Sequence, residues 1–270
     1  MKVTFCTTCM GRAHHLKQTL PTNLAGNVDW SEPEATEFVV LDYSSPDDLG
    51  AWLLNDPELA PYRDAGILRY ARVDGERFFR HSHAKNLAHA QATGEILCNV
   101  DADNFLGDGF AVWLRKVFRR TPNVIVATSR FSQRLNSGPY KGAMGRIAML
   151  SHNFWALGGY DESERFKGWA GEDTDLVLRA MRSGIAPVML RNPRFLQIIV
   201  HSDDERIANT DYADRDRELE RVRSLDGSNL APNLRYLYRF AKAPRIANQV
   251  TVARRRSLRP WFTRALARRR

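Results

Sequence analysis

Apolar runs and amphipathic stretches alternate along the first hundred residues of this 270-residue chain. The apolar runs, which read as strands, are residues 3–8, 37–42, 67–73 and 95–100. The amphipathic stretches between them, which read as helices, are residues 13–24, 47–55 and 82–92. Strands that alternate with helices in this way form a parallel sheet with right-handed crossovers. The sequence therefore predicts an α/β fold.

The alternation is less regular in the second half of the chain. The elements expected there are a helix over 110–119, a strand over 123–128, a polar surface excursion or hairpin over 129–145, an apolar block at 147–150, a turn at 158–161, a helix over 174–182 and strands over 185–190 and 195–200. Neither G-x-G-x-x-G after the first strand nor G-x-x-x-x-G-K-[S/T] occurs in the sequence. The glycine-rich phosphate loops of dinucleotide-binding and P-loop proteins are therefore missing, and bound phosphate would be neutralised in another way.

Two aspartates follow the strand expected over 95–100. Asp101 and Asp103 are separated by one small residue, so both would emerge at the carboxyl end of a buried strand, where open α/β sheets bind their ligands. Paired carboxylates suit a divalent cation that keeps coordination positions for substrate phosphates. The alternative is a helix N-cap or a turn, where Asp is also common. By itself the motif leaves both interpretations open.

A second group of acids lies at the start of the helix expected over 174–182. Glu172, Asp173 and Asp175 follow a tryptophan, Trp169, that has glycines on both sides. The helix dipole and capping favour acids at such a position, which gives a structural interpretation. The functional interpretation is a mobile aromatic platform, suited to a sugar ring, beside a carboxylate that acts as a general base.

His201 ends the strand expected over 195–200. A histidine at this position is either a hydrogen-bonded structural residue or a metal ligand. Together with Asp103 it would offer one imidazole nitrogen and one carboxylate beside phosphate oxygens. Mn²⁺ accepts such a set readily, and Mg²⁺ less so.

The three cysteines, Cys6, Cys9 and Cys98, are too few for a disulfide scaffold and agree with a reducing compartment. Cys6 and Cys9 form C-x-x-C after a strand, which is also the context of a thioredoxin-type redox site. A redox role would not explain the other sequence features of this long chain. Packing in the core and the adjoining loop is therefore the favoured interpretation.

The net charge of +9 is concentrated near the C-terminus. Residues 235–270 hold twelve Lys and Arg and no acid, which leaves 28 basic and 31 acidic side chains in residues 1–234. Residues 211–223 read as a charged, solvated helix, and residues 258–270 would form a helix with an apolar face among arginines. Such a tail would lie on an anionic membrane surface, dock on a partner or stay solvated, with nucleic-acid binding the least favoured.

Neither an apolar run long enough to cross a bilayer nor a charged leader with a cleavage site is found. We therefore expect a cytoplasmic protein, held on the inner face of the cell membrane if the tail binds lipid.

Taken in order, the motifs resemble those of family 2 type glycosyltransferases of the GT-A fold. The second half is similar to the galactosyltransferase carboxyl-terminal motif region of the Golgi beta-galactosyltransferases. The matching motifs, which cover residues 3 to about 206, are T-C-M-G-R at 8–12 with H-L at 15–16, A-K-N at 84–86, D-A-D at 101–103, G-G-Y at 158–160, W-A-G-E-D-T-D at 169–175 and H-S at 201–202.

The resemblance implies a Rossmann-like GT-A domain over residues 1–210, with a mixed, mostly parallel sheet flanked by helices. Its donor half would be residues 1–104 and its acceptor half residues 105–210. Residues 211–270 would then be a helical, basic C-terminal extension.

The resemblance also implies an inverting, metal-dependent transfer of a sugar from a nucleotide-diphosphate donor to a hydroxyl of a glycan or lipid-linked glycan. A UDP-sugar is the favoured donor, and Mn²⁺ or Mg²⁺ the metal. Asp103 and His201 would hold the metal and Asp173 would be the catalytic base. Trp169 and Glu172 would position the acceptor.

The donor-binding residues that the resemblance implies are Thr8, Arg12, Asp42, Lys85, Asp101 and Asp103. Thr8 and Arg12 would line the nucleotide end of the donor site. Asp42 would meet the base or ribose, and Asp101 the ribose or donor sugar.

Two positions depart from the family pattern. Where the Golgi enzymes carry a methionine ligand three residues before the histidine, this chain has Ile198, so water or phosphate would complete the metal shell. Ala170 replaces a glycine of the tryptophan loop, which would alter the mobility of that loop.

Two other functions stay open. A nucleotidyltransferase would need a basic phosphate-binding loop near the first strand, where only Arg12 is a candidate. A non-catalytic glycan- or nucleic-acid-binding protein would have no use for Asp103, Asp173 and His201 together.

Overall fold

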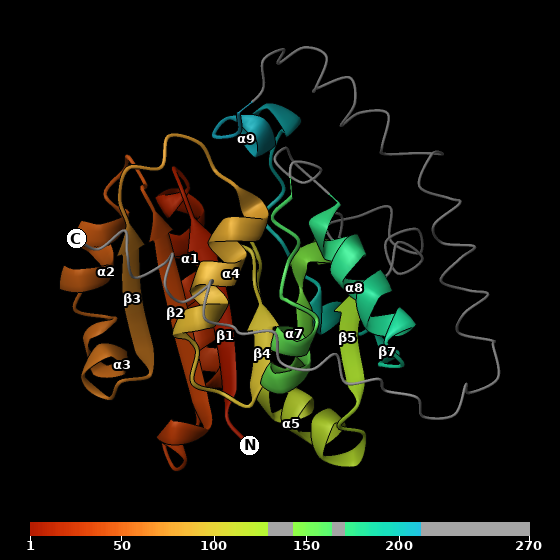
Figure 1. Cartoon of the computed structure of the whole chain (residues 1–270). Helices are drawn as coiled ribbons and strands as arrows, with labels where there is room; N and C mark the ends of the chain where they lie inside the picture. Colours follow the sequence, from red (N-terminus) through yellow and green to blue (C-terminus); the bar gives the residue numbers. More distant parts are fainter. Residues whose placement is uncertain (129–142, 164–170, 212–270) are drawn as a thin grey trace.

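The computed structural model describes residues 1–128, 143–163 and 171–211. Within these residues a seven-stranded sheet has the order β3-β2-β1-β4-β6-β5-β7 (Figure 1). The strands are β1 Val3–Cys9, β2 Thr36–Tyr43, β3 Leu68–Val73, β4 Ile96–Asn99, β5 Val124–Thr128, β6 Ile147–Leu150 and β7 Ala186–Leu190. Strand β6 is antiparallel to both of its neighbours, and the other pairings are parallel. The mixed, mostly parallel sheet that we expected is confirmed.

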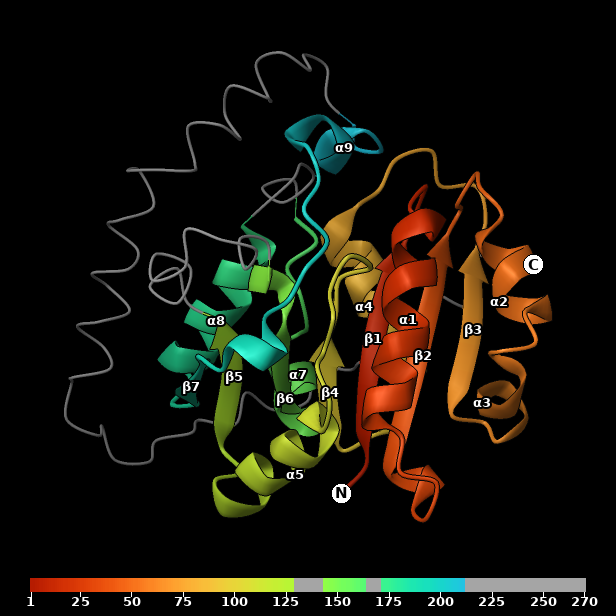
Figure 2. The same cartoon turned by 180° about the vertical axis from the view of Figure 1, so that it is seen from behind.

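Helices cover both faces of this sheet. The described helices are α1 Ala13–Asn27, α2 Leu49–Asn55, α3 Ala60–Asp64, α4 His81–Gln91, α5 Phe110–Arg120, α7 Ser151–Ala156, α8 Glu172–Arg182 and α9 Asp203–Ile207. Helices α4, α7 and α8 lie on the face turned to the viewer in Figure 1, and α1 and α5 lie on the opposite face, seen in Figure 2. Short 3₁₀ turns are η1 Pro33–Ala35, η2 Ala143–Gly145 and η4 Pro193–Phe195.

The central strand β1 shows why the core forms in two layers. Its side chains alternate between the faces of the sheet, because successive residues of a strand point in opposite directions. Phe5 packs with Phe38 and Phe110 on the α1–α5 side, with the Phe5 and Phe38 ring centroids 4.9 Å apart. Cys6 packs with Ala84 of α4 on the other side. Both faces of β1 are therefore buried, as its apolar run requires.

The prediction of a strand over residues 195–200 is wrong. Phe195 ends the 3₁₀ turn η4, and Ile198 makes only an isolated antiparallel bridge with Asn104. Phe195, Leu196 and Ile198 are buried, whereas Val200 is exposed. The backbone of this stretch pairs with the loop after β4, where Phe105 N–H donates to the Gln197 carbonyl. The loop after β4 provides hydrogen-bond partners for the backbone of this stretch. The stretch therefore does not pair with a strand of the sheet.

The other expected elements agree with the structure to within a few residues. Helices α3 and α7 were not expected, and α8 begins at Glu172, two residues earlier than predicted. Of the expected excursion over 129–145, residues 129–142 lie outside the described residues, and the last three form η2. The helix expected over 211–223 and the basic tail also lie outside, from residue 212 onward.

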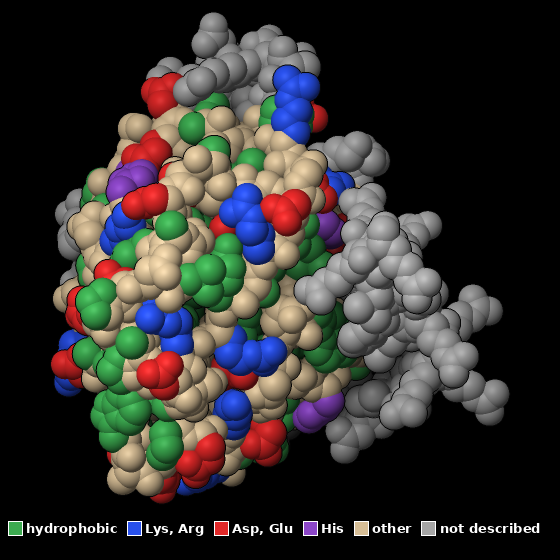
Figure 3. All heavy atoms as spheres, turned by 90° about the vertical axis from the view of Figure 1, so that its left-hand side faces the viewer, with side chains coloured by type: hydrophobic (Ala, Val, Ile, Leu, Met, Phe, Trp, Pro, Cys, Tyr) green, Lys and Arg blue, Asp and Glu red, His purple; other side chains and the backbone are tan. Residues whose placement is uncertain are grey.

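The surface in the described part of the chain carries both signs of charge. Basic and acidic side chains are interspersed over the face that includes α2 and β3 (Figure 3). None of the described helices is long and apolar enough to cross a membrane.

Candidate active site

The acids singled out in the sequence lie at one edge of the sheet. The parallel strands β1, β2 and β4 all end there, and β1 and β2 are in register up to Cys9 and Asp42. Because carboxyl ends of parallel strands share an edge, residues distant in sequence meet in the loops that follow them. The Asp101–Asp103 motif directly follows β4 in this position.

Asp103 and His201 are in direct contact. His201 Nε2 lies 2.7 Å from Asp103 Oδ2, at hydrogen-bond distance, and both side chains are buried. Backbone hydrogen bonds between the two segments position these side chains. Ile199 N–H donates to the Asp103 carbonyl, next to the Asn104–Ile198 bridge. Burial raises the pKa of Asp103, but the hydrogen bond to His201 and the charge of that histidine outweigh burial and bring the pKa below its usual value.

The donor set of this pair suits a divalent cation. A carboxylate oxygen and an imidazole nitrogen at 2.7 Å converge on one point, and the other oxygen of Asp103 accepts a hydrogen bond from Asn104 Nδ2 (2.6 Å). Such an outer contact orients a carboxylate for metal binding. The residues present therefore fit the Mn²⁺ or Mg²⁺ that the sequence resemblance implies, with Asp103 and His201 as its ligands and the remaining positions open.

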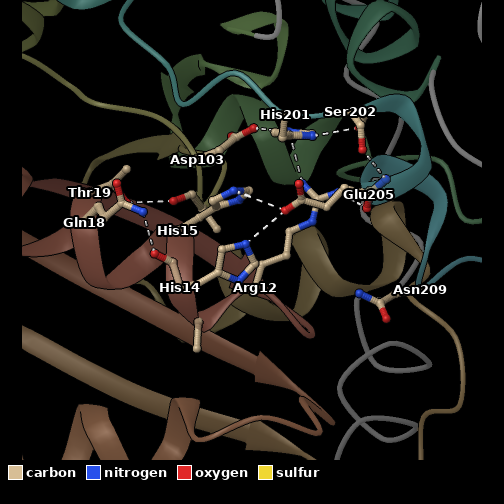
Figure 4. A network of polar contacts seen from close by, with 12 residues as sticks. Arg12, His14, His15, Gln18, Thr19, Asp103, His201, Ser202, Glu205 and Asn209 are labelled. Carbon is tan, nitrogen blue, oxygen red and sulfur yellow. Dashed lines mark hydrogen bonds and ion pairs between the residues drawn. The ribbon is translucent and has the colours of Figure 1, made fainter.

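Arg12 lies beside the same pair. Its Nη1 is 3.3 Å from His201 Nε2, and its Nη2 donates to the Glu205 carbonyl (Figure 4). The guanidinium is thus fixed in the turn between β1 and α1 by a segment nearly two hundred residues later. A fixed arginine of this kind matches the oxygen geometry of phosphates.

Asp101 faces a different neighbourhood from Asp103. It accepts a hydrogen bond from Asn99 Nδ2 (3.1 Å), and Lys85 Nζ lies 4.0 Å away. Burial, together with the nearby carboxylates, raises the pKa of Asp101, although Lys85 acts in the opposite direction. Gly145 is required here, because a Cβ on that residue would overlap the Asp101 carboxylate.

Lys85 of α4 joins the acids of α8 to this group. Its Nζ donates to Glu172 Oε1 and to Asp173 Oδ1, each at 2.8 Å, and its side chain is only 4% exposed. Burial lowers the pKa of Lys85, but Asp173 and Glu172 outweigh burial and keep the ammonium charged. Lys85 therefore holds three carboxylates, counting Asp101, around one cation.

The two acids of α8 differ in proton affinity. Burial, together with the charges of Glu172 and Asp101, raises the pKa of Asp173 to about 7. Burial also acts to raise the pKa of Glu172, but Lys85 and His81 outweigh it and lower that pKa to about 2. A pair of acids whose pKa values are separated in this way is typical of acid–base sites. Asp173 is the member that exchanges a proton near neutral pH.

Asp42 and Thr8 lie at the ends of their strands. Asp42 is fully buried, and its oxygens accept hydrogen bonds from Arg72 (2.6 Å), the Tyr70 hydroxyl (2.9 Å) and the Ser45 N–H (2.7 Å). Thr8 is half-buried near the end of β1. Trp169, expected to position an acceptor, lies outside the described residues.

Arg146 was missed by the sequence reasoning. It is 1% exposed just before β6, and its Nη2 donates to Asn104 Oδ1 at 2.8 Å, beneath the loop that carries Asp103. Its Nε and Nη1 have no hydrogen-bond partner within the described residues, and burial lowers its pKa to about 10. An arginine before an apolar strand normally marks an exposed end, so no local signal indicated its burial.

The cysteines support the packing interpretation. Cys6, Cys9 and Cys98 are free and buried. Burial raises the pKa of Cys9 and of Cys98 to about 12, so neither thiol forms the thiolate that redox chemistry needs.

Comparisons with known proteins agree with this fold. Residues 123–201 match the sequence pattern of a family described as the N-terminal domain of galactosyltransferase. No match to the chain was found among curated protein sequences.

Similar solved structures include the mannosyltransferase PcManGT from Pyrobaculum calidifontis with GDP-Man and Mn²⁺, at 20% identity and a TM-score of 0.55 over 71% of this chain and 55% of that one. Another is S. aureus TarS with UDP-GlcNAc, at 14% identity and a TM-score of 0.58 over 89% of this chain and 71% of that one. A third, GalNAc-T7 with UDP, GalNAc and Mn²⁺, has 12% identity and a TM-score of 0.53 over 71% of this chain and 42% of that one.

The fold is therefore that of the GT-A glycosyltransferases, as expected from the motifs. Within it, the segment from β5 to His201 carries galactosyltransferase-type sequence. The chain spans little more than half the length of the mannosyltransferase.

Proposed function

We propose that the chain is an inverting, metal-dependent glycosyltransferase. It would move a sugar from a nucleotide-diphosphate donor, with a UDP-sugar favoured, to a hydroxyl of a glycan or lipid-linked glycan. One observation carries the proposal: Lys85 Nζ lies within 4.0 Å of Asp101, Glu172 and Asp173, so acids of the donor and acceptor halves meet at one point. The similar structures that bind Mn²⁺ with GDP-Man, or with UDP and GalNAc, support the metal and the class of donor.

Asp103 and His201 would hold the divalent ion in this mechanism. When bound, the ion supplies Lewis-acid stabilisation of the diphosphate leaving group. Arg12, fixed 3.3 Å from His201, would add a positive charge beside the phosphates. Asp101, which points toward Lys85, would contact the ribose or the donor sugar.

Asp173 would remove the proton of the acceptor hydroxyl as its oxygen bonds to the anomeric carbon and the bond to the diphosphate breaks. Attack from the face opposite the leaving group inverts the anomeric centre. A pKa of about 7 suits a base that accepts a proton at neutral pH. The side chain is 16% exposed, so it keeps an opening toward an acceptor.

Release of nucleoside diphosphate from a panel of nucleotide sugars with Mn²⁺ tests the reaction class. A glycosyltransferase releases the diphosphate, whereas a nucleotidyltransferase would release pyrophosphate from a nucleoside triphosphate. A binding protein would release neither, and either of these results would overturn the proposal.

Calorimetry of UDP binding tests the metal ligands. Wild-type affinity should depend on Mn²⁺, and in Asp103→Ala that dependence should disappear because one of the two protein ligands is lost. His152→Ala, an exposed histidine of α7, is the control and should bind as wild type. Unchanged Mn²⁺-dependent affinity in Asp103→Ala would contradict the assignment.

A further inference from the structure

Two histidines and a glutamate converge beside Arg12, outside the Asp103–His201 pair. Glu205 Oε1 lies 3.1 Å from His14 Nε2 and 3.2 Å from His15 Nε2, and the three atoms are within 4.8 Å of one another (Figure 4). The histidines lie in the first turn of α1, and the glutamate belongs to α9, about 190 residues later. Neither the proposed transfer nor the donor site uses this group.

Two of the three spacings, those from Glu205 to each histidine, match a tetrahedral metal site. Zinc binds imidazole nitrogen and carboxylate oxygen at about 2.0–2.2 Å, which places two ligand atoms of a tetrahedron about 3.3 Å apart. The observed separations of 3.1 and 3.2 Å are close to that edge. Two imidazoles and one carboxylate, with a fourth position open to water, are a common ligand set for zinc.

The surroundings allow an ion to enter. His14 is 59% exposed and Glu205 31% exposed, so the site opens to solvent, whereas the His15 side chain is 5% exposed and gives the buried end. His15 Nδ1 has no hydrogen-bond partner within the described residues, so the ring proton can move to Nδ1 and leave Nε2 to bind a metal.

We propose that His14, His15 and Glu205 form a second metal site, selective for Zn²⁺ over Mn²⁺. Nitrogen-rich sites favour zinc over manganese in the usual order of affinities. The site is distinct from the Asp103–His201 pair, because His14 and Glu205 contribute no ligand to that pair.

Zinc bound here would clamp the C-terminal segment of the described chain to the start of α1. That segment carries His201 and Ser202, whose Oγ accepts from the Glu205 N–H at 3.2 Å. It also carries Asn209, which donates to the Met10 carbonyl at 2.7 Å. The clamp would therefore hold His201 and Arg12 in position without touching a substrate.

The experiment uses the full-length chain, freed of metal and titrated with Zn²⁺ by calorimetry in the Asp103→Asn background. That substitution removes a ligand of the first site, so the remaining binding reports the second. We expect one equivalent of Zn²⁺, weakened roughly a hundredfold or more by His14→Ala and by Glu205→Gln. His14 is mostly exposed, so its removal should leave the fold intact, and His152→Ala is the matched control.

Two further readouts keep the outcome clear. Zn²⁺ should raise the Tm of the Asp103→Asn chain but not that of its His14→Ala variant, and Co²⁺ in the site should give the strong visible absorption of a tetrahedral complex. Failure to bind Zn²⁺, or equal binding in His14→Ala, Glu205→Gln and the control, would overturn the second site. Neither result would bear on the glycosyltransferase proposal, which is tested by diphosphate release with Mn²⁺.

Discussion

At the scale of single residues, Lys85 decides the chemistry of the site. It is a buried ammonium that donates to Glu172 and Asp173 at equal distances of 2.8 Å. Glu172 is nevertheless ionised at all ordinary pH values, whereas the pKa of Asp173 is about 7. Burial and the charges of Glu172 and Asp101 raise the pKa of Asp173, whereas at Glu172 the charges of Lys85 and His81 outweigh burial. Asp173 therefore can bind and release a proton under physiological conditions.

The pH dependence of kcat/KM follows from this pKa. A raised carboxylate pKa means that Asp173 is protonated, and inactive as a base, below about pH 7. We expect kcat/KM to rise with pH through about 7 and then level off, as measured by diphosphate release.

Asp173→Asn should bind UDP and Mn²⁺ nearly as wild type but lack transfer. Near wild-type turnover in that variant would exclude Asp173 as the base.

Replacing Lys85 by methionine should destabilise the fold. The change leaves Glu172 and Asp173 buried without their cation, which costs about 3–5 kcal/mol of unfolding free energy. It should also move the acid limb of the kcat/KM profile to higher pH, because Lys85 opposes the rise in the pKa of Asp173. Denaturant unfolding and the pH profile measure the two effects.

Lys17→Met is the matched control for that experiment. Lys17 pairs with Asp48 at 2.6 Å near the surface, where such pairs contribute at most about 1 kcal/mol. A loss of stability in Lys85→Met no larger than in Lys17→Met would show that Lys85 is not the counter-ion described here.

At the scale of elements, the turn between β1 and α1 is the docking point for the segment after β7. Gly11 has a positive φ of 65°, and a Cβ there would lie 2.8 Å from Asn209 Nδ2. Asn209 in turn donates to the Met10 carbonyl. The absence of a side chain at residue 11 therefore allows the C-terminal segment to close over the turn that carries Arg12.

Gly11→Ala should weaken donor binding as well as stability. Both Gly11 and Gly66 have positive φ, so alanine at either position costs about 1–2 kcal/mol of backbone strain. Nothing lies within 4 Å of a Cβ at Gly66, which makes Gly66→Ala the control for strain alone. Only Gly11→Ala should lower the Mn²⁺-dependent affinity for UDP in calorimetry. Equal affinities in the two variants would mean that the docked segment does not shape the donor site.

At the scale of the whole molecule, charge divides the chain into two parts. Residues 1–234 are nearly balanced, and residues 235–270 hold twelve basic side chains and no acid. In the described part, acidic and basic side chains are interspersed on the face shown in Figure 3. We propose that the basic tail places the protein on an anionic membrane surface, close to lipid-linked acceptors.

Flotation with vesicles tests the tail. The full chain should float with vesicles that contain anionic lipid and much less with neutral vesicles, because both charge and an apolar helix face contribute. Replacing Trp261 and Leu266 together by glutamate should abolish flotation while leaving residues 1–211 unchanged. Equal flotation of the variant and wild type would remove the membrane role and leave docking on a partner or a solvated tail.

The sequence by itself determined the architecture and the edge of the sheet at which the candidate site lies. Alternating apolar runs and amphipathic stretches predicted β1 to β4 with α1, α2 and α4, because burial on two faces requires that pattern. The position of Asp101 and Asp103 directly after a buried strand placed them at the carboxyl edge. These features are local, so each is readable from a few neighbouring residues.

Only the tertiary structure decided how the site is assembled. The segment that bears His201 has the apolar residues of a strand but pairs with the loop after β4, since its partner was set by packing and not by its own pattern. Three contacts join residues roughly 40 to 190 positions apart. They are the hydrogen bond of buried Arg146 to Asn104, the ion pairs of Lys85 with the acids of α8, and the contacts of His14 and His15 with Glu205. Such contacts depend on how whole elements pack, and no local spacing encodes them.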